Sequence, residues 1–167
     1  PEMKEARVLL QELQDVTPNA HSRIFLEGNH ENWIEQGMTQ MPQLFEGLED
    51  LDLDISLKKL LALDRFKYDL FPMNHLVQIG KAHFTHGIHT GNNHAKKHLD
   101  TFKTNIYYGH LHDRTVHQQT SMEGNLESAS QGCLCRLDAA FLKGKPNNWC
   151  QGSGVWEIWP DGSYVHY

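Results

Sequence analysis

Residues 105 to 112 read NIYYGHLH, an apolar run that ends abruptly in a glycine and two histidines. The run predicts a short buried strand, because β-branched and aromatic side chains favour strands. Gly109 then permits a sharp turn directly after the strand. His110 and His112 would point to the same side of an extended segment, whereas a turn would let them face two neighbouring ions. The stretch therefore predicts a strand that delivers polar side chains to the edge of a sheet.

Two other apolar segments end in the same way. Residues 23–26 lead into Gly28-Asn29-His30-Glu31, and residues 81–85 lead into His86-Gly87. In α/β sheets, functional side chains collect at the carboxyl ends of the strands. We therefore expect the three turns to come from one sheet and to converge on one site.

The rest of the chain predicts helices and strands in an α/β arrangement. Helices are expected over residues 3–16, 55–66 and 92–103, and further strands over 76–80, 114–119, 155–159 and 163–167. Residues 33–71 have a helical pattern with breaks at Gly37, Pro42 and Gly47, and we interpret this segment as a helical insertion or cap. Glycine and serine are frequent from 121 to 132, and residues 141–154 indicate a loop.

The size and charge of the chain narrow the function classes. Its 167 residues fit one domain with a real core. A formal charge of −6 argues against broad electrostatic attraction to nucleic acid or to an anionic membrane. A local basic patch around Lys96, Lys97 and Lys103 is still an alternative, and no segment is long and apolar enough to span a membrane.

Cysteine and histidine usage indicates the compartment and the kind of chemistry. Three cysteines, an odd number, argue against a disulfide framework and favour a reducing, cytoplasmic compartment. Cys133 and Cys135 could hold a metal, but the favoured interpretation places them on one face of a strand as small apolar groups. Twelve histidines, several of them clustered, indicate metal or phosphate chemistry, because imidazole is both a metal ligand and a near-neutral acid or base.

Together, GNHE at 28–31, HG at 86–87 and GHLH at 109–112 resemble the motifs of calcineurin-like metallophosphoesterases. The stretch from Thr85 to Lys97 is also similar to phage and prophage members of that family. The resemblance covers residues 3–120 and extends less closely to the terminal hairpin. It implies a sandwich of two mixed sheets flanked by helices, with two divalent ions (Mn2+, Fe2+ or Zn2+) at the sheet edge.

The resemblance also implies roles for individual residues. Asn29, His86 and His110 would bind one ion, and His112 would bind the other. His30 would be the catalytic histidine, which stabilises charge or protonates the leaving oxygen. Glu31 would orient His30. A hydroxide shared by the two ions would attack phosphorus in line.

Two family motifs, Asp-x-His and Gly-Asp-x-x-Asp, do not occur in this sequence. We therefore expect a single metallophosphoesterase domain that lacks its amino-terminal strands and is inactive by itself. An open sheet edge would favour self-association.

Several alternatives stay open. Candidates for contact with the substrate are Glu31, His94 and Arg114. For His94 and His98, which are four residues apart on a helix, a solvated helix face is the favoured interpretation. Trp149 is a candidate for an exposed aromatic that stacks on a base. The expected partner is a phosphate ester, either a monoester or a diester such as nucleic acid, and not a membrane. The other function class is a non-catalytic remnant of the fold that serves as a binding or structural module.

Overall fold

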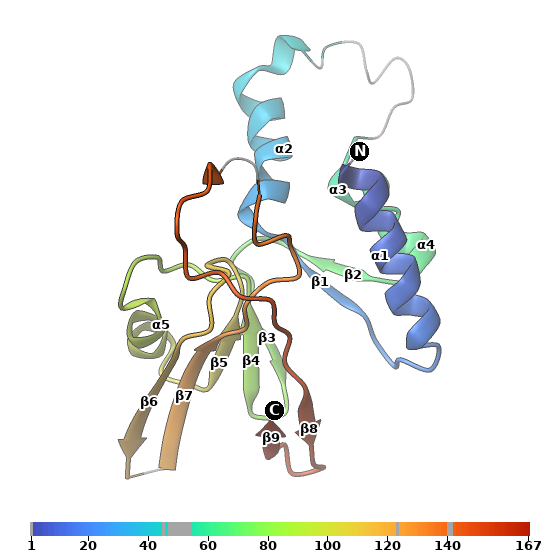
Figure 1. Ribbon diagram of the computed structural model, residues 1–167. Coiled ribbons are helices and arrows are strands. Elements are labelled where there is room, and N and C mark those ends of the chain that lie inside the picture. Colours follow the sequence, from blue (N-terminus) through green and yellow to red (C-terminus); the bar gives the residue numbers. More distant parts are fainter. Residues whose placement is uncertain (1, 45, 47–54, 123, 140–141) are drawn as a thin grey trace. The chain divides into compact units, whose positions relative to one another are not determined.

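The computed structural model describes residues 2–44, 46, 55–122, 124–139 and 142–167, and it has a mixed α/β fold (Figure 1). The chain divides into two compact units, Pro1–Met73 and Asn74–Tyr167, which are described in turn. In the part of the chain that is described, no helix has the length and apolar character needed to cross a bilayer.

The first unit combines helices with a two-stranded parallel sheet. Its elements are α1 (Glu2–Val16), β1 (Ile24–Leu26), α2 (Asn29–Gln40), the 3-10 helix η1 (Pro42–Leu44), α3 (Leu57–Leu60), α4 (Leu63–Phe66) and β2 (Asp69–Phe71). Strands β1 and β2 pair in parallel, with Phe25 opposite Leu70. The core forms where Leu10 of α1 packs with the buried side chains of α3 and α4 and with Leu61, which lies between these two helices. The helix predicted over 3–16 is confirmed.

Three predictions for residues 33–71 are wrong. Gly37 does not break α2, because one glycine in a helix costs only about 1 kcal/mol. The helix expected over 55–66 is two short helices, which Ala62 separates by adopting a left-handed backbone with φ of 55°. The residues of β2 are extended, because they pair with β1. The predicted break at Gly47 lies outside the described residues, whereas α2 does end before Pro42, as predicted.

The second unit contains a five-stranded mixed sheet with strand order β3-β4-β5-β7-β6. Its elements are β3 (Val77–Ile79), β4 (Ala82–Thr85), α5 (His94–Phe102), β5 (Ile106–Tyr108), β6 (Val116–Ser121), β7 (Gly124–Ser130), β8 (Trp156–Ile158) and β9 (Tyr164–His166). Strands β4, β5 and β7 are mutually parallel, whereas β3 and β6 run antiparallel to their neighbours at the two edges. Strands β8 and β9 form the predicted hairpin.

Helix α5 and the β8–β9 hairpin pack against the sheet of this unit (Figure 1). Alternation along β5 separates its side chains, because successive residues of a strand point to opposite faces. Tyr108 stacks on His98 of α5, while Tyr107 contacts Trp156 and Tyr164 of the hairpin. All three residues of β5 are buried, so this strand is the centre of the unit's core.

The sheet contains a strand that the sequence pattern did not predict, and it corrects one further prediction. Glycine and serine are frequent over residues 121–132, yet β7 lies there and pairs between β5 and β6. The three strands with polar ends were expected in one sheet, yet only β4 and β5 are neighbours there, and β1 belongs to the two-stranded sheet of the first unit.

Candidate metal site and its supporting histidines

His86 and His110 follow two neighbouring parallel strands, β4 and β5, and their rings meet at the carboxyl edge of the sheet. His86 Nε2 lies 3.1 Å from His110 Nδ1, and the ring planes are inclined by 64°. The Gly109 amide donates a 3.0 Å hydrogen bond to the His86 carbonyl, which fixes one turn against the other. At Gly87, with φ of 112°, a Cβ atom would lie 3.2 Å from His110 Cβ, so glycine permits this close approach. The structure therefore brings together two of the predicted ligands.

The GHLH segment is a tight turn and not an extended strand. Both His110 and His112 have left-handed backbones, with φ of 68° and 64°. The Leu111 amide donates to the Gly109 carbonyl at 2.8 Å, which closes the turn. The imidazoles consequently have different neighbours: His110 meets His86, and His112 packs edge-on against Trp149 with 4.3 Å between ring centroids.

A cysteine pair that sequence analysis assigned to packing lies beside His112. Cys133 makes an isolated bridge and Cys135 lies in a bend, so the expected strand face does not exist. The two Sγ atoms are 3.2 Å apart, and Cys135 Sγ is 3.7 Å from His112 Nδ1. Burial, together with the hydrogen bond to Cys133, raises the pKa of the Cys135 thiol to about 11. A thiol of this kind is protonated at neutral pH and is a poor nucleophile.

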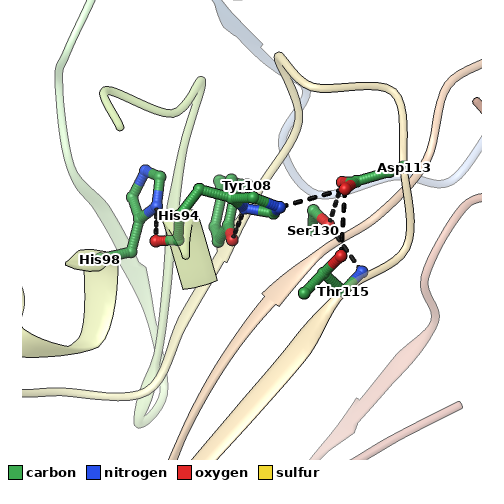
Figure 2. A network of polar contacts seen from close by, with 6 residues as sticks. All are labelled: His94, His98, Tyr108, Asp113, Thr115 and Ser130. Carbon is green, nitrogen blue, oxygen red and sulfur yellow. Dashed lines mark hydrogen bonds and ion pairs between the residues drawn. The ribbon is translucent and has the colours of Figure 1, made fainter. Parts of the chain in front are cut away.

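His94 is buried, which corrects the expected solvated helix face. Its ring connects α5 to the segment after the GHLH turn (Figure 2). His94 Nε2 lies 3.0 Å from the Asp113 carboxylate, to which it donates, and Nδ1 lies 2.6 Å from the Tyr108 hydroxyl oxygen. Burial raises the pKa of that hydroxyl above its usual value. These two hydrogen bonds therefore join α5 to β5 and to the segment after the GHLH turn. The contact between His94 and a substrate stays a prediction.

Asp113 anchors this network as an ionised carboxylate. Burial opposes its ionisation, but hydrogen bonds from Ser130 and Thr115, with nearby His94, outweigh burial and hold its pKa below the usual value. The Ser130 and Thr115 hydroxyls donate to it at 2.8 and 3.0 Å. The sequence pattern indicated a surface position for Asp113, although its place directly after GHLH is a local signal.

His98 is also buried, again in contrast to the expected solvated face. Its Nδ1 donates to the His94 carbonyl at 2.8 Å, and its Nε2 accepts from the amides of Ile88 and His89 at 3.0 and 3.3 Å. Burial lowers the pKa of His98 to about 4. A neutral ring is therefore required, and it holds the loop that begins just after His86.

The residues of the GNHE motif lie in the first unit, at the junction of β1 and α2. Asn29 begins α2, and His30 is exposed in its first turn, with its ring stacked on Trp33 at 4.4 Å. The Glu31 carboxylate accepts from the Gly28 amide at 3.1 Å, which caps the helix. The expected turn is thus a strand-to-helix junction that presents His30.

The other two candidates for substrate contact lie in the second unit. Arg114 is exposed, as a group that meets phosphate would be. Trp149 is half-buried because its ring packs on His112, so the expected exposed aromatic is wrong.

No protein-family model, curated protein or solved structure matches this chain.

Proposed function

We propose that this protein is a metal-dependent phosphoesterase, which cleaves a phosphomonoester or a phosphodiester, with nucleic acid among the candidate substrates. The observation that carries the proposal is the 3.1 Å approach of His86 Nε2 to His110 Nδ1. Both histidines come from segments that resemble metal-binding motifs of calcineurin-like metallophosphoesterases, and each follows a parallel strand of one sheet. Sites of α/β proteins commonly gather at this edge.

The donor geometry of the pair fits a single divalent ion. Two nitrogen ligands about 2.1 Å from an ion lie about 3.0 Å apart at a right angle and about 3.4 Å apart at the tetrahedral angle. The observed separation of 3.1 Å falls between these values. Imidazole nitrogen is a suitable ligand for Mn2+, Fe2+ or Zn2+. By resemblance, Asn29 would complete this set and His112 would bind a second ion. Such ions, when bound, activate water and neutralise charge on the phosphoryl group.

The chain's own residues hold the two imidazoles in place. His98 fixes the amides of residues 88 and 89, and the Gly109 amide fixes the His86 carbonyl. These contacts restrain the backbone on both sides of the pair, and preorganised ligands bind an ion without a further ordering cost. In the proposed reaction, the His30 ring donates a proton to the leaving oxygen. Its exposed position suits a group that must meet a substrate from solvent.

The proposal is tested on the whole protein by two measurements: its affinity for Mn2+, and its rate of phosphodiester hydrolysis with Mn2+ bound. We expect His86→Ala to weaken Mn2+ binding by about tenfold or more in calorimetry and to abolish hydrolysis of bis-(p-nitrophenyl) phosphate. His89→Ala is the matched control, because the His89 ring bonds to Thr101 and lies in the same loop. Unchanged metal affinity in His86→Ala would refute the proposal.

His30 separates metal binding from chemistry. If His30 acts on the phosphate and does not bind the ion, His30→Ala should keep its Mn2+ content and lose turnover by roughly 10². Equal loss of metal and turnover would identify His30 as a ligand. A protein with neither metal affinity nor hydrolysis would favour the non-catalytic binding module.

A further inference from the structure

A second group of possible metal ligands consists of His112, Cys133 and Cys135. It differs from the His86–His110 pair because two of its three ligands are thiols. One ligand atom of each residue lies within 4.8 Å of the other two. Cys135 Sγ is 3.2 Å from Cys133 Sγ and 3.7 Å from His112 Nδ1. His112 and Cys133 are half-buried and Cys135 is exposed, so the cluster can be reached from solvent.

Main-chain hydrogen bonds hold the cluster's segments together without any ligand. The Cys150 amide donates to the His112 carbonyl at 2.8 Å, and the Cys133 amide donates to the Cys150 carbonyl at 3.0 Å. The Gly132 amide donates to the Asp113 carbonyl at 2.8 Å. Gly132 has φ of 73°, and a Cβ atom there would lie 2.8 Å from the Cys150 carbonyl oxygen. The close contact between Gly132 and Cys150 therefore requires glycine, and it holds the segment of the two thiols beside His112.

We propose that His112, Cys133 and Cys135 bind one thiophilic divalent cation, with zinc as the expected ion and a fourth position left to solvent. Two thiols lose their protons to solvent as two metal–sulfur bonds form, and His112 Nδ1 gives its lone pair. Two thiolates neutralise the charge of the ion, and sulfur ligands select zinc over manganese or magnesium. Three protein ligands and an open position are the arrangement of a reactive zinc site.

The distances are close to those of a tetrahedral zinc site. Zinc–sulfur bonds of about 2.3 Å and zinc–nitrogen bonds of about 2.0 Å separate a sulfur from a nitrogen by about 3.5 Å and two sulfurs by about 3.8 Å. The Cys135–His112 distance of 3.7 Å already matches, and the Cys133–Cys135 distance of 3.2 Å requires a small rotation of one thiol. None of the three cysteines of the chain forms a disulfide in this structure.

This inference does not rest on the phosphoesterase function, because it requires only zinc binding. It does bear on that function, since His112 is the residue that the family resemblance assigns to the second ion. Because two thiolates lie beside His112, the site of this second ion would select zinc, whereas the His86–His110 pair would still accept manganese.

Cobalt is the probe for the cluster, because a cobalt–thiolate bond gives a charge-transfer band in the near ultraviolet. We expect one Co2+ per chain to produce this band in the reduced protein, and Zn2+ to displace it. Cys133→Ser and Cys135→Ser should each lose the band, while Cys150→Ser, the matched control at a thiol outside the cluster, should keep it. His112→Asn should weaken cobalt binding about tenfold or more, since asparagine tolerates a left-handed backbone but lacks the imidazole.

The inference would be overturned by the absence of a charge-transfer band at saturating Co2+, or by a band that Cys150→Ser removes as fully as Cys133→Ser does. Thermal melts of all three serine variants should first establish that each is folded. His86→Ala keeps this test independent of the proposed function, because it should weaken manganese binding and retain the cobalt–thiolate band. Loss of the band in His86→Ala would also refute the proposed site.

Discussion

At the scale of single residues, His98 shows how a neutral imidazole supports a site that it does not enter. Its two nitrogens satisfy one carbonyl of α5 and two amides of the loop after His86. Protonation of Nε2 would remove the acceptor for both amides and place a charge among buried groups. His89, His94 and His110 oppose that charge as well. The loop therefore depends on His98 staying neutral.

The stability of the protein should consequently fall in mild acid. The folded pKa of His98 is about 4, below its ordinary value of 6.5, so the unfolded chain binds more protons between these pH values. The contribution of neutral His98 to the free energy of unfolding is fully present above pH 6.5. It is lost as the pH falls through 6.5 towards 4, and the total loss is up to about 3 kcal/mol. Urea denaturation at pH 7 and pH 5 measures the difference.

His98→Phe isolates this contribution. Phenylalanine keeps the stack on Tyr108 but leaves the Ile88 and His89 amides without an acceptor, so we expect a loss of about 1–3 kcal/mol at pH 7. The variant should also have a shallower slope of stability against pH than the wild type. His21→Phe, at an exposed position, controls for the removal of one imidazole. Equal slopes in His98→Phe and wild type would contradict this account.

At the scale of elements, the sequence predicted the helices and strands that depend on the local pattern of apolar and polar residues. Strands β3, β4 and β5 and the terminal hairpin followed from apolar and β-branched runs, and their polar ends identified His86 and His110. Strand β7 was missed because its glycine, serine and alanine residues have little strand preference, and pairing with β5 and β6 makes it extended.

Helix α5 shows a signal that was present but misread. His94 and His98 were placed on a solvated face because imidazole is polar. Their neighbours Ala95 and Leu99 are buried with them, so the four positions form one stripe that faces the sheet. The cysteine cluster is different, because the contact of residues 133 and 135 with His112 depends on backbone pairing far along the chain, which no local pattern records.

The hairpin β8–β9 docks at a glycine contact that can be tested at this scale. Gly80 has φ of 61°, and a Cβ atom there would lie 2.7 Å from the Gly162 carbonyl oxygen and 2.8 Å from Ile158 Cγ2. The Lys81 amide donates to the same Gly162 carbonyl at 2.8 Å. Gly80→Ala should therefore displace the hairpin from the β3–β4 turn.

Gly144→Ala separates backbone strain from collision, because Gly144 has φ of 70° and nothing within 4 Å of its Cβ position. We expect about 1 kcal/mol of destabilisation for Gly144→Ala from the left-handed backbone, and a further 1–3 kcal/mol or so for Gly80→Ala from overpacking. Tryptophan fluorescence should shift to the red only in Gly80→Ala, since Trp156 packs in the hairpin interface. Equal losses in both variants would mean that the contact is not tight.

At the scale of the whole molecule, the chain separates into two units, and each contains residues to which the family resemblance assigns a role. The first unit has its own leucine-rich core and carries Asn29 and His30. The second unit has a sheet covered by α5 and the hairpin, and it contains the His86–His110 pair and the cysteine cluster. The family resemblance therefore assigns metal ligands to both units and the catalytic histidine to the first unit.

A fragment of residues 74–167 tests this division. Because its sheet, helix and hairpin form their own core, the fragment should unfold cooperatively and keep the acid dependence that His98 confers. It should also retain the cobalt–thiolate band, since every proposed ligand of that site lies within it. Without Asn29 its manganese affinity should fall, and without His30 it should show no turnover. An unfolded fragment would show that the first unit is needed to complete the fold of the second. A folded fragment with the manganese affinity of the whole chain would instead remove Asn29 from the ligand set, because nothing else proposed to bind that ion lies outside the second unit.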